Sequence, residues 1–412
     1  MAEHAPVLIV GAGPAGVAAA CAACESGAAV TLIDDNPAVG GQIWRGSMPP
    51  EWLARIGRAL PKVMPNARAI GFTGPQTLLA EHEGRAREIG FDRLIIATGA
   101  RERLLPFPGW TLPGVMGVGG LQALVKSGLP IAGKRVVITG SGPLLAAVAA
   151  SMVKAGAQVL MIAEQAKKAN VLSFAASAAR SVGKMRQAFD IGKTIRRVPY
   201  RMSSWPISAV QEGEALSVTM SVDGAEQRLA CDYLACGFGL VPNTELAQLA
   251  ACTLIDGCVD TDDHQMTSVT TIYCAGEPTG IGGVDGALAE GLIAGYHAAG
   301  KNAMARKQQG ARDRWRGFQR AMESAFELRE ELKGLPTAET IVCRCEDITF
   351  GQTAGHLSWR DAKLQSRCGM GACQGRVCGP AMEFLVGLPM ESVRLPLYPV
   401  TVGTLAGLHT GK

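Results

Sequence analysis

Five of the chain's twelve cysteines lie within a stretch of thirty-six residues, from Cys343 to Cys378. The first two form a C-x-C pair, Cys343 and Cys345, and the others are Cys368, Cys373 and Cys378. In an extended chain, residues i and i+2 project to the same side, so the pair can face one centre. Neighbouring glycines let backbone N–H groups approach the sulfurs and stabilise thiolate charge. Four of these sulfurs would be enough to hold a metal centre.

The spacing of these cysteines favours an iron–sulfur cluster. Structural zinc sites normally use C-x-x-C pairs, whereas this segment has C-x-C followed by C-x4-C. Disulfides are disfavoured because the clustered cysteines and the missing signal peptide predict a reducing, cytoplasmic setting. Zinc, or no metal at all, remain as alternatives. Spacing alone does not decide whether Cys368 or Cys378 completes the ligand set.

Composition excludes several function classes. The chain has 412 residues, with Lys+Arg 40 against Asp+Glu 36 and only 5% aromatic residues. This balance predicts no nucleic-acid partner. Two uncharged stretches, 5–24 and 136–153, each contain a Gly-Pro turn near the middle. We therefore interpret both as strand–turn–helix units and predict no transmembrane segment.

The first of these stretches carries a dinucleotide-binding pattern. A buried strand leads into Gly11-x-Gly13-x-x-Gly16, and a helix and second strand follow, ending at Asp34. The glycines allow a tight turn, close approach of a pyrophosphate and close packing of helix on strand. Asp34 is placed to bind a ribose diol. The candidate cofactor-binding residues of this unit are Gly11, Gly13, Pro14, Ala15, Gly16, Asp34 and Asp35.

Three shorter segments extend this candidate site. "GGQIWR" follows the second strand and supplies Gly41 and Gln42. An apolar strand precedes Thr98-Gly99, and another precedes Gly276-Glu277 and a helix rich in small residues. A strand-to-helix cap is an equally good interpretation of Gly276-Glu277 taken alone.

A second glycine turn, Gly140-x-Gly142, repeats the plan with Leu145 at the third glycine position. Glu164 ends the next strand and could bind a ribose. Leucine at the close-packing position should push helix and strand apart. We therefore predict a degenerate nucleotide site here, with a working NAD(P)H site as the alternative.

Residues 165–205 are rich in Lys and Arg and carry almost no acid. They fit a solvated basic helix pair, or a contact surface for a partner chain or an acidic ligand. Residues 301–340 have mixed charge and predict a helical linker. Beyond the linker, 341–412 would form a small third domain that holds the five cysteines.

The glycine turns, "ATG" and "AGE" segments resemble the two-dinucleotide-binding flavoproteins of the pyridine nucleotide-disulfide reductase type. The resemblance implies an α/β, Rossmann-like fold with FAD in a discontinuous domain, 1–115 and 240–300, and a second nucleotide domain over 116–239. Relatives usually have Asp where Glu277 stands. The cysteine segment resembles the α-rich BFD-like domain that holds a [2Fe-2S] cluster. This resemblance implies Cys343, Cys345, Cys373 and Cys378 as ligands and Cys368 as the spare.

The order of these parts resembles the α chains of opine oxidases, D-hydroxyproline dehydrogenase and hydrogen cyanide synthase. It implies an electron-transfer subunit of an amino-acid or imino-acid dehydrogenase, with oxidation of the substrate on a separate FAD-dependent β chain. Some relatives hold FMN at a subunit interface, and a small ferredoxin-like γ chain is a further expected partner. The expected location is cytoplasmic, or peripheral to the inner membrane. One alternative function is a self-contained NAD(P)H-dependent FAD reductase, and another is a purely structural role in assembly. The first nucleotide site could also hold an adenine nucleotide other than FAD.

Overall fold

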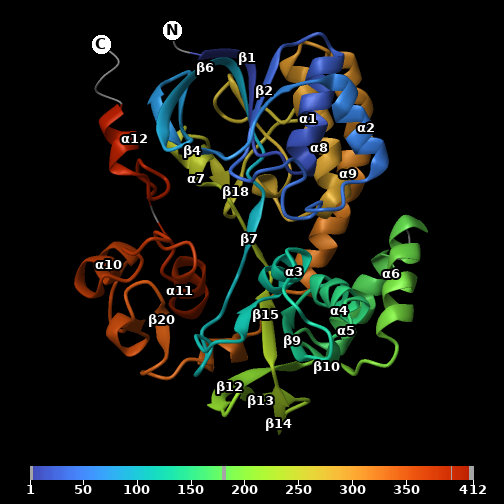
Figure 1. Cartoon of the computed structure of the whole chain (residues 1–412), viewed down its shortest axis with the longest axis vertical. Helices are drawn as coiled ribbons and strands as arrows, with labels where there is room; N and C mark the ends of the chain where they lie inside the picture. Colours follow the sequence, from blue (N-terminus) through green and yellow to red (C-terminus); the bar gives the residue numbers. More distant parts are fainter. Residues whose placement is uncertain (1–2, 179–181, 391, 408–412) are drawn as a thin grey trace. The chain divides into compact units, whose positions relative to one another are not determined.

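The computed structural model describes residues 3–178, 182–390 and 392–407 (Figure 1). The chain divides into two compact units. The first contains Met1–Arg101, Pro242–Gln319 and Ser392–Lys412, and the second contains Glu102–Val241 and Arg320–Glu391. Residues 102–115, which the sequence assigned to the FAD domain, group with the second unit. The tail beyond residue 391 groups with the first, because the Leu397 N–H donates to the Ile70 carbonyl at 2.8 Å.

A seven-stranded sheet forms the centre of the first unit, in the order β3-β2-β1-β6-β5-β4, with β19 also paired to β6. Its strands are β1 (Glu3–Val10), β2 (Val30–Ile33), β3 (Lys62–Met64), β4 (Ala67–Gly74), β5 (Thr77–His82), β6 (Arg85–Ile96) and β19 (Ile272–Cys274). Successive β1 residues enter different cores, Leu8 on one face of the sheet and Ile9 on the other. Burial on both faces explains the apolar run over residues 5–10 of β1.

Two helices of small residues cover one face of this sheet, α1 (Pro14–Glu25) and α8 (Gly283–Ala298). A Cβ added at Gly291 would lie 2.2 Å from the Ala15 carbonyl oxygen, and one at Gly295 would lie 2.3 Å from that of Ala19. The two helix backbones therefore pack directly against each other. The remaining helices of this unit are α2 (Pro50–Ala59), α7 (Glu245–Leu249), α12 (Val402–Gly407) and most of α9 (Asn302–Ala325).

A five-stranded parallel sheet, β11-β10-β9-β15-β8, forms the centre of the second unit, beside an antiparallel sheet of β12, β13 and β14. The parallel strands are β8 (Val115–Gly117), β9 (Arg135–Ser141), β10 (Gln158–Glu164), β11 (Tyr200–Arg201) and β15 (Tyr233–Phe238). The antiparallel strands are β12 (Ser204–Glu212), β13 (Ala215–Val222) and β14 (Ala225–Cys231). The helices are α3 (Val118–Lys126), α4 (Leu144–Lys154), α5 (Lys168–Ala178) and α6 (Val182–Ile195).

The cysteine segment belongs to the second unit and has a small core of its own. It contains β20 (Ile341–Cys343), β21 (Ile348–Thr349), α10 (Trp359–Ser366) and α11 (Cys378–Val386). Val342, Trp359 and Met382 pack in this core with three of the cysteines. The indole N–H of Trp110 donates to the Ile341 carbonyl at 2.5 Å and fixes the strand that leads into Cys343.

Candidate functional site: two glycine turns and a cysteine cluster

The first glycine turn has the geometry that a pyrophosphate requires. Gly11 has φ +104°, a conformation open to glycine, and Gly13 directly precedes Pro14 and Ala15 at the start of α1. A Cβ on Gly16 would lie 1.7 Å from the Gly11 carbonyl oxygen, so this position accepts only glycine. A Cβ on Gly13 would meet nothing within 4 Å. The helix N-terminus is therefore open to an anion at Gly13.

Asp34 braces this turn with its carboxylate. Oδ2 accepts the Ala12 N–H at 2.5 Å, and Oδ1 accepts the backbone and side-chain N–H groups of Asn36, each at 2.7 Å. A carboxylate has about four acceptor positions, so Oδ2 still has capacity for a ribose hydroxyl. The side chain of Asp35 is 51% exposed and lies 3.8 Å from Arg68. Asp34, and not Asp35, therefore faces the turn.

Two of the other predicted segments, those that contain Gly41 and Gly276, pack against this turn. An added Cβ at Gly41 would lie 2.9 Å from the Gly13 Cα, and one at Gly276 would lie 2.8 Å from the Ala15 Cβ. Both glycines have positive φ, +58° and +82°. Gln42 is exposed. Residues that are far apart in sequence thus line one site, and glycine at both positions allows the close approach.

The Thr98-Gly99 segment is held by a residue that the sequence did not single out. Asn243 donates from Nδ2 to the Thr98 carbonyl at 2.9 Å, and its carbonyl accepts the Thr98 hydroxyl at 2.6 Å. Its backbone N–H donates to the Gly99 carbonyl at 2.9 Å. Arg101 donates to the Asn243 Oδ1 at 2.8 Å and pairs with Glu245 at 2.8 Å. No motif pointed to Asn243, which directly follows the short strand β16 (Leu240–Pro242).

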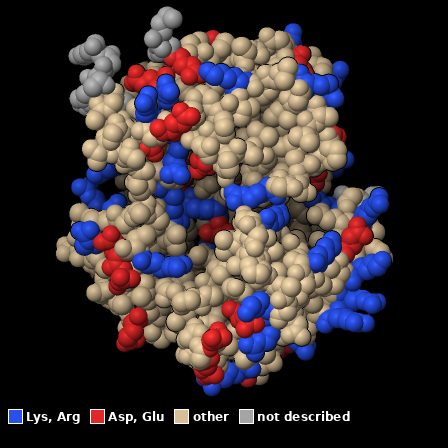
Figure 2. Space-filling model, viewed as in Figure 1, with Lys and Arg blue, Asp and Glu red and all other residues tan. Residues whose placement is uncertain are grey.

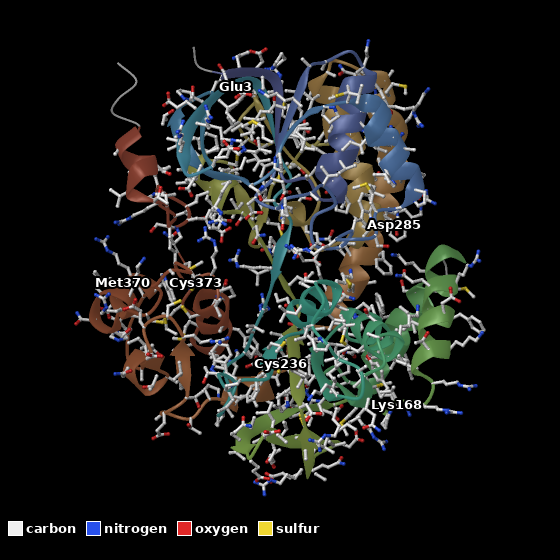
Figure 3. All side chains as sticks on the ribbon, in the orientation of Figure 1. Glu3, Lys168, Cys236, Asp285, Met370 and Cys373 are labelled. Atoms are coloured by element: carbon white, nitrogen blue, oxygen red, sulfur yellow. The ribbon has the colours of Figure 1, made fainter. Side chains whose placement is uncertain are left out.

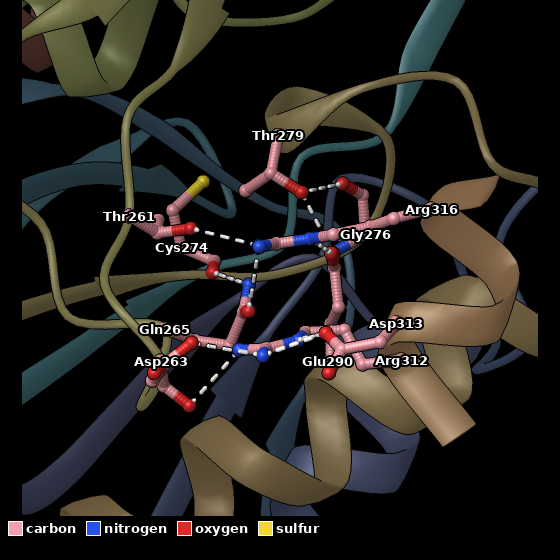
Figure 4. Close-up of polar contacts among 10 residues, drawn as sticks. All are labelled: Thr261, Asp263, Gln265, Cys274, Gly276, Thr279, Glu290, Arg312, Asp313 and Arg316. Carbon is pink, nitrogen blue, oxygen red and sulfur yellow. Dashed lines mark hydrogen bonds and ion pairs between the residues drawn. The ribbon is translucent and has the colours of Figure 1, made fainter. Parts of the chain in front are cut away.

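A buried carboxylate on α8 anchors the Gly276 turn (Figure 4). Glu290 Oε2 accepts the Gly276 N–H at 2.9 Å and the Thr279 hydroxyl at 2.7 Å, and Arg316 of α9 lies 3.7 Å from Oε1. Burial raises the pKa of Glu290. The sequence did not predict this contact, although a charged residue inside the small-residue run "GALAEGLIAG" is the feature that could have indicated it.

Glu277 lines a small pocket together with the start of α8 and with Arg312 and Trp315 of α9. Burial raises the pKa of its carboxyl to about 7. A carboxyl group in this setting is suited to a neutral hydrogen-bonding partner, such as a polyol hydroxyl.

The second glycine turn differs from the first at its acid. Glu164 is fully buried, and its two oxygens accept the N–H groups of Gly142 at 2.8 Å and Ala166 at 2.9 Å. Burial raises its pKa to about 7. Leu145 is also buried and packs in the core of this unit, and a Cβ on Gly140 would lie 1.9 Å from the Gly237 carbonyl oxygen. Glu164 therefore exposes no oxygen to a ribose.

The segment that follows α9 covers the second turn. The Ser141 hydroxyl donates to the Phe326 carbonyl at 3.0 Å. The Gln165 amide donates to the Glu327 carbonyl at 3.0 Å and accepts the Arg329 N–H at 3.2 Å. We call residues 326–329 the covering segment. Its backbone lies against the β9 and β10 ends, where a nucleotide would approach the second unit.

All five clustered cysteines lie together in the second unit. The sulfurs of Cys343, Cys368 and Cys378 are all within 4.8 Å of one another, and these residues are buried. The thiols of Cys345 and Cys373 form a second contact. Cys345 is exposed and Cys373 is half-buried; Figure 3 labels Cys373 and the neighbouring Met370.

The surroundings of these sulfurs suit thiolate ligands. Hydrogen bonds from Cys368 and Cys378, then from the backbone N–H of Gly369 and Glu346, lower the pKa of Cys343 to about 2. The pKa of Cys373 is lowered to about 5, mainly by a hydrogen bond from the Cys378 thiol. The donor set of clustered thiols fits an iron–sulfur cluster, and the open first turn with its braced acid fits the adenine-nucleotide half of FAD.

Comparison with known proteins places the chain in a family. The model of the pyridine nucleotide-disulphide oxidoreductases matches residues 5–303. Hydrogen cyanide synthase subunit HcnB of Pseudomonas protegens is 31% identical, and the match covers 90% of this chain and 89% of the HcnB chain. Opine oxidase A of Rhizobium meliloti, which is likewise named as a subunit, is 30% identical, covering 97% and 98% respectively.

Solved structures share the fold at lower identity. L-proline dehydrogenase of P. horikoshii superposes with a TM-score of 0.70 at 18% identity, covering 98% of this chain and 80% of its own. T. acidophilum thioredoxin reductase gives a TM-score of 0.55 at 22% identity, covering 73% and 98%. The predicted α/β, two-dinucleotide-binding fold is confirmed. The chain belongs to the pyridine nucleotide-disulphide oxidoreductase family, in the group that contains opine oxidase A and the HcnB subunit of hydrogen cyanide synthase.

Proposed function

We propose that this chain is the electron-transfer α subunit of a heteromeric amino-acid or imino-acid dehydrogenase. FAD would bind at the first turn, through the turn residues, Asp34 and Glu277. A [2Fe-2S] cluster would be held by Cys343, Cys345, Cys373 and Cys378. A separate FAD-dependent β subunit would oxidise the substrate, and an FMN at the subunit interface is compatible with this arrangement. Flavin exchanges electrons in pairs and the cluster one at a time, so together they would link substrate oxidation to a one-electron acceptor.

The observation that carries this proposal is the covering of the second turn by the chain's own backbone. In a self-contained reductase, NAD(P)H would bind at the ends of β9 and β10. Here Ser141 and Gln165, at those ends, hydrogen-bond to the covering segment instead. Glu164 is also fully buried, so neither of its oxygens is open to a ribose. Electrons are therefore expected from a partner chain and not from a nicotinamide.

The relatives' names support the partner and the substrate class. Opine oxidase A and HcnB are both named as subunits, which supports a multi-subunit complex. Opines and proline are secondary amines that are oxidised at a CH–NH bond. This shared chemistry supports amino or imino acids as the substrate class, and a small ferredoxin-like γ chain would be a further partner. Among the described residues, no helix is long and apolar enough to cross a membrane.

One surface of the second unit has the composition of a partner contact. The apolar side chains of Leu172 on α5 and of Met185 and Phe189 on α6 are 55%, 52% and 72% exposed. Figure 2 shows basic side chains around α6. Exposed basic residues of this stretch are Lys167, Lys168, Arg186, Lys193, Arg196, Arg197 and Arg201. We call this the α5–α6 surface, and a partner with apolar side chains among carboxylates would complement it.

An absorbance titration tests the proposed function. The chain would be purified alone and together with the product of a neighbouring gene, and NADH or a panel of imino and amino acids would be added under anaerobic conditions. Flavin and cluster bands should bleach with an imino or amino acid, and only when the partner is present. Stoichiometric bleaching of the lone chain by NADH would instead establish a self-contained reductase. A flavin that no amino-acid substrate of the complex reduces would point to a purely structural role in assembly.

A further inference from the structure

A chain of hydrogen bonds lies behind the acid of the first glycine turn. Arg45 Nη2 donates to Asn36 Oδ1 at 2.7 Å, and Asn36 Nδ2 donates to Asp34 Oδ1 at 2.7 Å. Arg45 and Asn36 are half-buried, whereas Asp34 is buried. Neither Asn36 nor Arg45 was among the residues that the sequence assigned to the nucleotide site. Two residues outside the predicted site are therefore linked to the carboxylate that would bind a ribose.

Arg45 fixes the orientation of the Asn36 amide. A guanidinium group has only hydrogen-bond donors, whereas an amide side chain has a carbonyl oxygen at one end and an NH2 group at the other. The carbonyl oxygen of Asn36 therefore faces Arg45, and the NH2 group is left to face Asp34. The reverse orientation would place an oxygen against the carboxylate and N–H donors against a cation, so both contacts would become repulsive.

The amide in turn fixes the carboxylate. Asp34 Oδ1 accepts the side-chain and backbone N–H groups of Asn36, each at 2.7 Å, and Oδ2 accepts the Ala12 N–H at 2.5 Å. Rotation of the carboxylate would break these bonds, because both of its oxygens are held. Ala12 lies between the first two glycines of the turn. The acceptor capacity left on Oδ2 is therefore held in one direction beside the turn.

We propose that Asn36 and Arg45 are positioning residues that orient Asp34 to accept a ribose hydroxyl. An acceptor that is already oriented loses less freedom when the hydroxyl binds, so the ribose contact gains affinity. An arginine beside a ribose-binding acid can instead receive a phosphate group on the ribose. The contact of Arg45 with an uncharged amide oxygen favours the positioning role. This inference rests on the nucleotide site of the proposed function.

The test compares two probes that differ only at the ribose. Calorimetric titration of the cofactor-free full chain gives the Kd for ADP and for dideoxy-ADP, which lacks both ribose hydroxyls. The readout is the ratio of the two Kd values, and it is insensitive to a change of protein charge because the probes carry the same charge. The wild type should bind ADP about tenfold more tightly, since a hydroxyl bonded to a carboxylate is a charge-assisted contact.

The variants act on the two hydrogen bonds in turn. Asn36→Ala and Arg45→Met should each bring the two Kd values close to equality by weakening the binding of ADP and not of dideoxy-ADP. Arg45→Lys retains a donor and should keep a ratio near that of the wild type. Arg58→Met removes an exposed positive charge from α2 in the same unit and should leave the ratio unchanged.

An isosteric variant keeps the test independent of how the truncated side chains fold. Asn36→Asp preserves the size of the side chain, and the backbone there stays held because the Asn36 carbonyl accepts the Asn66 N–H at 3.1 Å. Its second carboxylate cannot donate to Asp34, so the preference for ADP should again be lost.

The other outcomes separate this inference from the proposed function. Affinity for both probes that falls by the same factor in Asn36→Asp or Arg45→Met would mean that these residues do not act through the ribose, and it would overturn the inference. Equal Kd values of the two probes in the wild type would remove the ribose contact of Asp34 and overturn it as well. A wild-type chain that binds neither probe would overturn the nucleotide site of the proposed function itself.

Discussion

Replacing Gln165 with Ala should loosen the covering segment over the second turn. The Gln165 amide makes two hydrogen bonds to this segment, to the Glu327 carbonyl at 3.0 Å and from the Arg329 N–H at 3.2 Å. Each is worth about 1 kcal/mol net, so the variant should lose about 2 kcal/mol of local stability. The bond from Ser141 to the Phe326 carbonyl would remain.

Amide hydrogen exchange measures this loss directly. Exchange of residues 326–329 follows local opening, and about 2 kcal/mol corresponds to an opening population roughly 30-fold larger. Gln158→Ala is the matched control, because Gln158 begins β10, the strand that Gln165 directly follows, and is exposed. Exchange in the covering segment that is equal in the two variants would refute the contacts we assign to Gln165.

The same contacts set how weakly NADH should bind. The three hydrogen bonds contribute about 3 kcal/mol, and the edge-to-face contact of Phe326 with Phe174, 5.1 Å between centroids, adds about 1 kcal/mol. A site that must first open at a cost of about 4 kcal/mol binds its ligand about 1,000-fold more weakly. Flavin reduction by micromolar NADH in the lone wild-type chain would therefore contradict the reasoning.

Three other variants probe separate parts of the molecule. Cys343→Ser should abolish the cluster absorbance and electron transfer to an acceptor while flavin stays bound; normal transfer in this variant would exclude the cluster as a carrier. Glu277 has a folded pKa of about 7 against 4.5 unfolded, so the wild-type flavin-free chain should lose stability as pH rises from 4.5 to 7, by roughly 3 kcal/mol. Chemical denaturation should show that Glu277→Gln lacks this loss, and a pH-independent difference between the two proteins would refute the shift. The double variant Arg196→Glu, Arg197→Glu should weaken binding of the partner chain at least tenfold at low salt. Lys134→Glu, which changes an exposed charge away from the basic stretch, should leave the affinity unchanged. Equal affinities of the double variant and the wild type would exclude the α5–α6 surface as the partner contact.

Local sequence patterns predicted the first nucleotide-binding unit. The strand, glycine turn and helix around Gly11 follow from contacts within about twenty-five residues, and the close approach of Gly16 to Gly11 needs no partner from elsewhere. Gly41 and Gly276 were also among the predicted residues, although they approach the turn from other segments. A Cβ at Gly41 would lie 2.9 Å from the Gly13 Cα and one at Gly276 would lie 2.8 Å from the Ala15 Cβ, so the residue type reflects the contact.

The contacts that position the Thr98 segment and the covering segment have no recognisable pattern in the sequence. Asn243 holds Thr98 from 145 positions away, and Ser141 meets Phe326 across 185 positions. Hydrogen bonds to backbone carbonyls place no demand on the side chain of the partner. The covering segment therefore has no motif, and Leu145 alone could only suggest that the second turn had changed.

The comparison of Asp34 with Glu164 shows why a motif and its function can separate. Both acids end the second strand of a strand–turn–helix–strand unit, and both brace their turn through a backbone N–H. Asp34 is 8% exposed, with acceptor capacity remaining, whereas Glu164 is 0% exposed. Bracing the turn is a structural role that needs no ligand, so we expect the acid to persist in a turn that has lost its nucleotide. The covering segment hydrogen-bonds to Ser141 and Gln165 on either side of this turn, and the proposed loss of nucleotide binding rests on that contact and on the burial of Glu164.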